Sequence, residues 1–137
     1  MAKPSPLLSA LLYAGTVYFI AMATAHFFGL KYPLLFIYYD VPFYEYQDKI
    51  ISFCSFTYAC LFYAAAGNLE TVPAALVSLL ATVLGLSYIN SSTALSKVLN
   101  GGPTSAYWLQ TGLIAFYLLL LAALYFSSPK ARKSSAK

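Results

Sequence analysis

The chain has 137 residues, of which 61% are hydrophobic and 9% charged, and its mean hydropathy is +0.71. About a quarter of the residues of an ordinary soluble domain are charged, so this composition excludes a soluble protein. The net charge of +4 does not indicate nucleic-acid binding, because four of the eight basic residues fall in the last eight positions and leave no basic domain face. A membrane-spanning helix needs about 20 apolar residues, so the length predicts one membrane domain over residues 1–137 with four spans.

The order of apolar runs predicts an all-α fold, an integral membrane four-helix bundle. Spans are predicted at about residues 7–29, 50–66, 72–89 and 107–126. Gly67 and Asn68 predict a tight turn between the second and third spans, which are therefore antiparallel neighbours. The sequence TALSKVL at 93–99 predicts one or two turns of helix at the surface.

Residues 31–49 differ in character from the spans on either side. Pro33 and Pro42 interrupt this segment, and tyrosines and phenylalanines surround them. Proline inside a helix removes a hydrogen bond, so the segment is not a continuous span. Aromatic side chains of this kind favour the headgroup level of a bilayer. We therefore predict an interfacial aromatic loop between helices 1 and 2.

Basic residues near the ends of the spans predict the orientation of the protein. An even number of spans puts Lys3 and the basic tail 127–137 on one side, and Lys31, Lys49 and Lys97 on the other. Cytoplasmic loops carry the excess of lysine and arginine, so both termini are predicted to be cytoplasmic. The tail serves as a topology signal or contacts anionic lipids.

Common catalytic motifs are missing from the sequence. It has no GxSxG, HExxH, Walker, GxGxxG or CxxC pattern, so hydrolase, zinc-protease, nucleotide-driven and thiol-redox functions lack their usual residues. Cys54 and Cys60 are six residues apart, about 9 Å along a helix, which is too far for a disulfide. We predict two buried, unpaired thiols.

His26 is the only histidine and lies near the end of the first predicted span. An ionisable residue in a span is a candidate for function, although a histidine near the interface also serves as a hydrogen-bonding partner between helices. One histidine cannot supply a two-histidine haem site or a three-histidine zinc site. We therefore predict no metal site, and the sequence identifies no cofactor.

Three of the four acidic residues follow His26 within one loop. Asp40, Glu45 and Asp48 are expected at the same membrane face as His26. A carboxylate beside the imidazole would orient it and form a proton-transfer pair. A carboxylate beside Lys49 at a helix N-terminus would instead stabilise the first turn. We favour the second role for Glu45, and both roles stay open for Asp48.

An aromatic, weakly polar cleft between helices suits a flat or isoprenoid ligand such as a quinone, a sterol or another lipid. The candidate ligand-binding residues are His26, Tyr38, Tyr39, Asp40, Tyr44, Gln47, Asp48 and Gln110. Anchoring at the bilayer interface also accounts for the tyrosines of this set.

The first predicted span ends in the sequence HFFGLK, from His26 to Lys31, and an aromatic segment and three further spans follow. This layout resembles that of the small DoxX-like four-helix membrane proteins. The resemblance covers the order and length of the spans and implies a four-helix architecture. Members of that group are linked to membrane redox complexes, but no motif carries that role to residues of this chain.

Two functional hypotheses follow from these observations. The first is a non-enzymatic protein that binds a lipophilic ligand or acts as an accessory subunit, with the bilayer and other membrane subunits or further copies of itself as partners. The second is a small membrane enzyme acting on a lipid- or quinone-like substrate, with His26 and Asp48 or Asp40 as an acid–base pair. The second requires the imidazole to lie within hydrogen-bond reach of an acid.

Overall fold

The computed structural model describes residues 2–31 and 44–128. The described elements are α1 (Pro6–Phe28), α2 (Glu45–Gly67), η2 (Leu69–Thr71), α3 (Val72–Asn90), α4 (Thr93–Val98) and α5 (Ser105–Phe126). These two ranges contain helices and no strand, which confirms the predicted all-α fold. The short α4 confirms the surface helix expected at 93–99.

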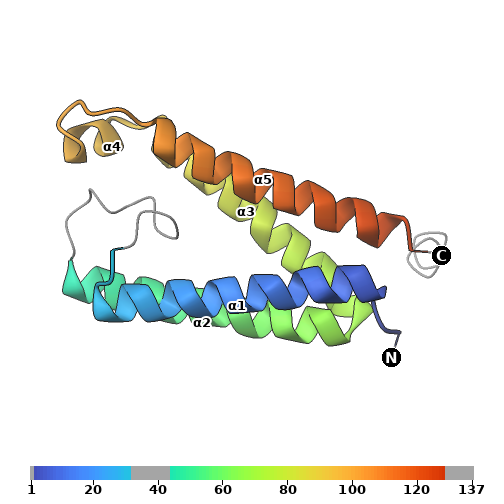
Figure 1. Cartoon of the computed structure of the whole chain (residues 1–137). Coiled ribbons are helices and arrows are strands. Elements are labelled where there is room, and N and C mark those ends of the chain that lie inside the picture. The colour runs from blue at the N-terminus through green and yellow to red at the C-terminus, as the bar shows by residue number, and fades with distance from the viewer. Residues whose placement is uncertain (1, 32–43, 129–137) are drawn as a thin grey trace.

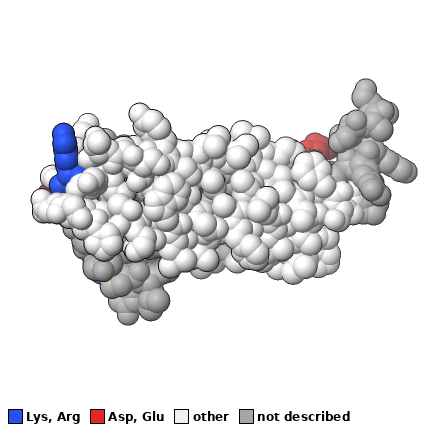
Figure 2. All heavy atoms as spheres, turned by 90° about the horizontal axis from the view of Figure 1, so that it is seen from above, with Lys and Arg blue, Asp and Glu red and all other residues white. Residues whose placement is uncertain are grey.

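Four helical stretches are long and apolar enough to cross a membrane, namely α1, α2, η2 together with α3, and α5. Each has 22 or 23 residues, which corresponds to about 33–35 Å of helix, slightly more than the hydrocarbon thickness of about 30 Å. On the face shown in Figure 2, charged side chains lie only at the two ends of the molecule. By the length and composition of its helices, the chain is a multi-pass membrane protein.

The long helices form two antiparallel pairs. One pair is α1 with α2, and the other is α3 with α5 (Figure 1). The pairs approach each other where α1 begins and diverge toward the end that carries α4. The beginning of α1 and the end of α5 lie at the same end of the molecule, as an even number of spans requires. The cytoplasmic location of that end stays a prediction.

The buried apolar core lies at the end where the two helix pairs approach. It consists of Leu8, Leu12, Phe62, Ala65, Ala66, Leu69, Val72, Ala75, Leu79 and Leu121. The Tyr117 hydroxyl of α5 crosses to α1 and donates to the carbonyl oxygen of Leu11 at 2.7 Å. The Tyr117 ring stacks on that of Phe62, with 6.3 Å between centroids. Core packing and this long-range hydrogen bond therefore hold the two pairs together at one end.

The ends of α1 follow from its local sequence. The Ser5 side chain accepts from the Leu8 N–H, and Pro6 occupies the first turn, where its missing N–H costs no helical hydrogen bond. Gly29 adopts a φ of 66°, a left-handed conformation that glycine reaches without strain. The Leu30 N–H then donates to the carbonyl oxygen of Ala25 at 2.8 Å and closes the helix end.

Helix α2 begins at Glu45, five residues before the predicted start at about Ile50. Two interactions stabilise this additional turn. Asp48 accepts a hydrogen bond from the Tyr44 N–H, and Lys49 pairs with Glu45 one helical turn away. The prediction that the loop extends to residue 49 is therefore wrong for residues 45–49. The remainder of the predicted aromatic loop, at 32–43, lies outside the described residues.

The two cysteines of α2 correct a second prediction. Cys54 and Cys60 are free, as expected from their spacing, but both are exposed rather than buried. No other described helix covers either side chain. In a bilayer both side chains contact lipid, where a thiol group is as acceptable as in a protein core.

Tyr58 links the two helix pairs within the membrane-spanning region. Its hydroxyl lies 3.0 Å from Thr82 Oγ1, whose own proton goes to the Ser78 carbonyl oxygen at 2.9 Å, so Tyr58 is the donor. We expect Tyr58→Phe to lower the free energy of unfolding by about 0.6 kcal/mol, the average for interhelical hydrogen bonds in membranes. Thermal unfolding in detergent measures this loss. Tyr88→Phe is the control, since Tyr88 is 76% exposed and its replacement should leave the unfolding temperature unchanged.

Candidate functional site

His26 and Asp48 meet at the membrane face where α1 ends and α2 begins. The imidazole Nδ1 lies 2.8 Å from Asp48 Oδ1, well within hydrogen-bond reach. The two side chains are 13% and 18% exposed, so both are largely covered but retain access to the surface. The separation satisfies the geometric requirement for an acid–base pair.

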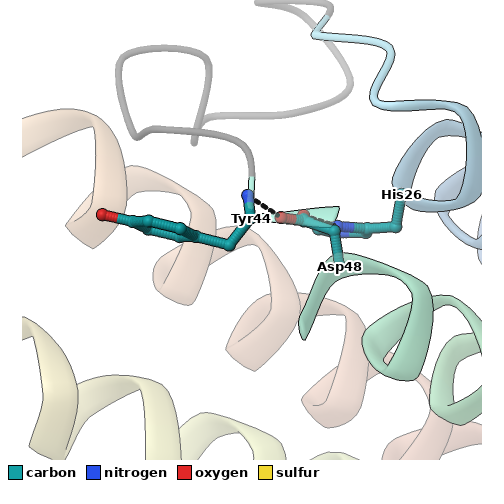
Figure 3. A network of polar contacts seen from close by, with 3 residues as sticks. All are labelled: His26, Tyr44 and Asp48. Atoms are coloured by element: carbon teal, nitrogen blue, oxygen red, sulfur yellow. Dashed lines mark hydrogen bonds and ion pairs between the residues drawn. The ribbon is translucent and has the colours of Figure 1, made fainter. Parts of the chain in front are cut away.

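The carboxylate of Asp48 makes a second hydrogen bond through its other oxygen. Asp48 Oδ2 accepts from the Tyr44 N–H at 2.9 Å, and the Tyr44 ring points away from the pair (Figure 3). This bond satisfies one of the N–H groups that a helix start leaves without an intrahelical partner. The structure therefore contains both contacts that the sequence left open for Asp48, because one oxygen faces His26 and the other accepts from the N–H at the start of α2.

The two hydrogen bonds fix the orientation of the imidazole. An ionised carboxylate only accepts hydrogen bonds, so with Asp48 ionised the Nδ1 atom of His26 carries a proton. The Tyr44 N–H fixes one oxygen of the carboxylate, and the other oxygen then holds the imidazole in a defined ring orientation, as in proton-transfer pairs.

The surroundings of the pair combine charge and aromatic surface. Glu45 is paired with Lys49, as predicted, and the Lys49 ammonium group lies 5.8 Å from the centroid of the Phe27 ring. Phe27 also contacts the Phe53 ring edge to face, at 6.3 Å between centroids. Phe27 and Phe53 are 39% and 63% exposed. An exposed aromatic surface from α1 and α2 therefore adjoins the polar pair.

The other predicted site residues fall into three groups. Tyr44 and Gln47 are exposed at the start of α2, and Tyr44 contributes through its backbone. Gln110 lies on α5 and is only 6% exposed. Tyr38, Tyr39 and Asp40 lie outside the described residues, so their place in the candidate site stays a prediction.

Gln110 has a partner that the sequence does not indicate. Its side chain hydrogen-bonds to the Tyr18 hydroxyl of α1. The carbonyl oxygen Oε1 of Gln110 is buried and has no hydrogen-bond partner within the described part of the chain. Tyr18 is one of the 13 tyrosines of the chain and lies in an apolar run, so the sequence does not distinguish it. Only the approach of α5 to α1 in the fold reveals its polar contact.

Asn90 and Thr111 provide a second polar contact in the same half of the molecule. Asn90 Nδ2 donates to Thr111 Oγ1 at 2.9 Å, and Thr111 Oγ1 donates to the Tyr107 carbonyl oxygen at 3.0 Å. These bonds join the end of α3 to the beginning of α5. Asn90 is therefore a structural residue that ties the second helix pair together.

No group of three or more histidine, cysteine, aspartate or glutamate side chains gathers within residues 2–31 and 44–128. One imidazole and one carboxylate can donate and accept hydrogen bonds and can exchange a proton.

Comparisons with known proteins give no relative for this chain. No protein-family model matches it, and neither a curated protein nor a solved structure does. The resemblance to DoxX-like proteins thus stays a prediction, and the functional argument rests on the geometry of the candidate site.

Proposed function

We propose that this membrane protein binds a lipophilic small molecule at the face where α1 ends and α2 begins, with His26 and Asp48 recognising its polar group. The observation that supports this proposal is the 2.8 Å hydrogen bond between two ionisable side chains of different helices. Ionisable groups at membrane depth are costly and are rare without a function.

The chemistry of the surroundings suits a ligand with an apolar body and one polar group. The exposed rings of Phe27 and Phe53 supply apolar contact surface beside the pair. Imidazole and carboxylate together donate and accept hydrogen bonds, so they match a carbonyl, hydroxyl or phenol group. A quinone, a sterol or another lipid combines these properties.

Two other functions draw on the same observation. An oriented imidazole beside a carboxylate is also the arrangement of a general acid–base pair, which favours an enzyme acting on a lipid- or quinone-like substrate. An accessory subunit of a membrane complex would use the same face to contact a partner protein. The following experiment separates the three.

The test compares purified wild-type protein with two variants of the pair and one control. Wild type, His26→Ala, Asp48→Ala and Glu45→Ala are purified in mild detergent, and mass spectrometry identifies the lipids and proteins that copurify. Glu45 is the matched control, because it is a carboxylate on the same helical turn that pairs with Lys49 instead of His26. We expect a lipophilic molecule with wild type and the control, reduced at least about tenfold in both variants of the pair.

Equal amounts of every lipid and protein in all four samples would overturn the proposal. Loss of a copurified protein instead of a lipid favours the accessory-subunit function. Chemical conversion of the bound molecule by wild type, abolished by His26→Ala, favours the enzyme. Asp48→Asn, which retains an oxygen and a donor at the same position, replaces Asp48→Ala if the latter does not fold.

A further inference from the structure

The Gln110 side chain presents a buried hydrogen-bond acceptor in the interior of the molecule. The residue is 6% exposed, and its Oε1 atom has no hydrogen-bond partner among the described residues. A buried carbonyl oxygen without a donor destabilises a protein substantially. The polar pairs His26 with Asp48 and Asn90 with Thr111 are hydrogen-bonded, which makes Gln110 Oε1 the exception.

The location of Gln110 suits a molecule that enters from the bilayer. Gln110 lies about 8 Å from the beginning of α5 by helical rise, on the half of the molecule where the two helix pairs diverge (Figure 1). In that half, residues 80–89 of α3 include no buried residue. The contact between Gln110 and Tyr18 bridges α5 and α1 across the diverging pairs.

We propose that Gln110 binds the hydroxyl group of a lipophilic alcohol, such as a sterol or a long-chain alcohol, that inserts between α1 and α5. This site is distinct from the pair of His26 and Asp48, so the inference goes beyond the proposed function. The alcohol donates its proton to Gln110 Oε1, while the amide nitrogen keeps its hydrogen bond to the Tyr18 hydroxyl. The hydroxyl group of the bound alcohol then lies near the beginning of α5, just below the membrane interface, where the polar end of an amphiphile normally resides.

The donor requirement separates alcohols from ketones and quinones. A ketone has no proton to donate and would place its own oxygen against Oε1, whereas an alcohol supplies the missing donor. If the Gln110 amide were turned by 180°, Nε2 would face the ligand and would donate to a hydroxyl and to a ketone alike. A preference for alcohol over ketone therefore requires Oε1 to face the ligand.

The test uses two matched pairs of probes on the full chain in nanodiscs. Cholestanol is compared with cholestanone, and hexadecan-2-ol with hexadecan-2-one, by the concentration that gives the half-maximal rise in unfolding temperature. We expect at least one alcohol to bind wild type about tenfold more tightly than its ketone, as loss of a hydrogen bond to a buried partner implies. Gln110→Met should abolish this preference.

Two controls keep the result specific. Gln110→Met removes the unpartnered oxygen together with one interhelical hydrogen bond to Tyr18, so without ligand its unfolding temperature should fall only slightly below that of wild type. Asn90→Leu removes a hydrogen-bonded amide elsewhere in the same half and should lower the unfolding temperature while retaining the preference for alcohol.

Three outcomes would overturn the inference: equal binding of alcohol and ketone, a preference that survives Gln110→Met, or binding of neither alcohol. None of them overturns the proposed function, which is tested separately by the lipids that copurify with the His26 and Asp48 variants. Conversely, a preference for alcohol that depends on Gln110 but not on His26 supports this site and leaves the proposed function to its own test.

Discussion

Replacing Gly15 with valine should be among the most destabilising single substitutions in this chain. A Cβ atom at Gly15 would lie 2.5 Å from the Tyr117 hydroxyl oxygen and 2.6 Å from a carbon of the Phe62 ring. Both separations are far shorter than van der Waals contact, and the Phe62 side chain is fully buried. Either the rings move or α1 separates from α5, which breaks the hydrogen bond from Tyr117 to Leu11.

Overpacking of this kind costs about 1–3 kcal/mol for a well-packed core, and valine adds two further methyl groups to the same contact. We expect Gly15→Ala to lower the unfolding temperature in detergent clearly and Gly15→Val to lower it further. Gly112→Ala is the matched control on α5, because a Cβ atom there meets nothing within 4 Å. An unfolding temperature of Gly15→Val equal to that of Gly112→Ala would contradict the packing seen around Gly15.

The spans were predictable from sequence because hydropathy and helix length are local properties. The predicted bounds at 72–89 and 107–126 differ from α3 and α5 by at most two residues at either end. The start of α2 was not predictable in this way. It depends on the side chain of Asp48 turning back to the Tyr44 N–H, an interaction that hydropathy does not register.

The divergence of the two helix pairs could not be predicted from the sequence either. Every span is apolar on nearly all sides, as expected for helices that face lipid, so the pattern does not identify which faces pack together. The core at one end depends on particular contacts, such as those of Gly15 and Tyr117, that join residues about 100 positions apart.

For the candidate site, sequence reasoning found the ionisable residues but not their neutral partners. His26 and Asp48 were conspicuous because charged groups are rare in spans, and the loop brought them to one membrane face. Gln110 was predicted as a candidate because it is polar. Tyr18 is one of 13 tyrosines, and nothing in the sequence around it distinguishes it from the others. Its role depends on which helix lies opposite α1, which is a property of the tertiary structure.

The double role of Asp48 leads to a prediction about stability. Asp48→Ala removes the hydrogen bond to His26 and the cap on the Tyr44 N–H together. We expect it to lower the free energy of unfolding by about 1–3 kcal/mol, the usual cost of leaving partners without hydrogen bonds at a largely covered site. Glu45→Ala should have a much smaller effect, because its ion pair with Lys49 is exposed. Denaturant-induced unfolding in detergent measures both changes.

Asp48→Asn should instead preserve the fold and shift the proton of the neutral His26 imidazole from Nδ1 to Nε2. Its amide oxygen can accept from the Tyr44 N–H, and its NH₂ group then donates toward His26 Nδ1. A neutral imidazole satisfies this donor only with its own proton on Nε2, whereas the carboxylate of wild type requires the proton on Nδ1. Because the chain has a single histidine, ¹⁵N NMR of histidine-labelled protein at alkaline pH reports the tautomer directly. A proton that stays on Nδ1 in Asp48→Asn would show that Asp48 does not control the state of the imidazole, and an acid–base role for the pair would lose its basis.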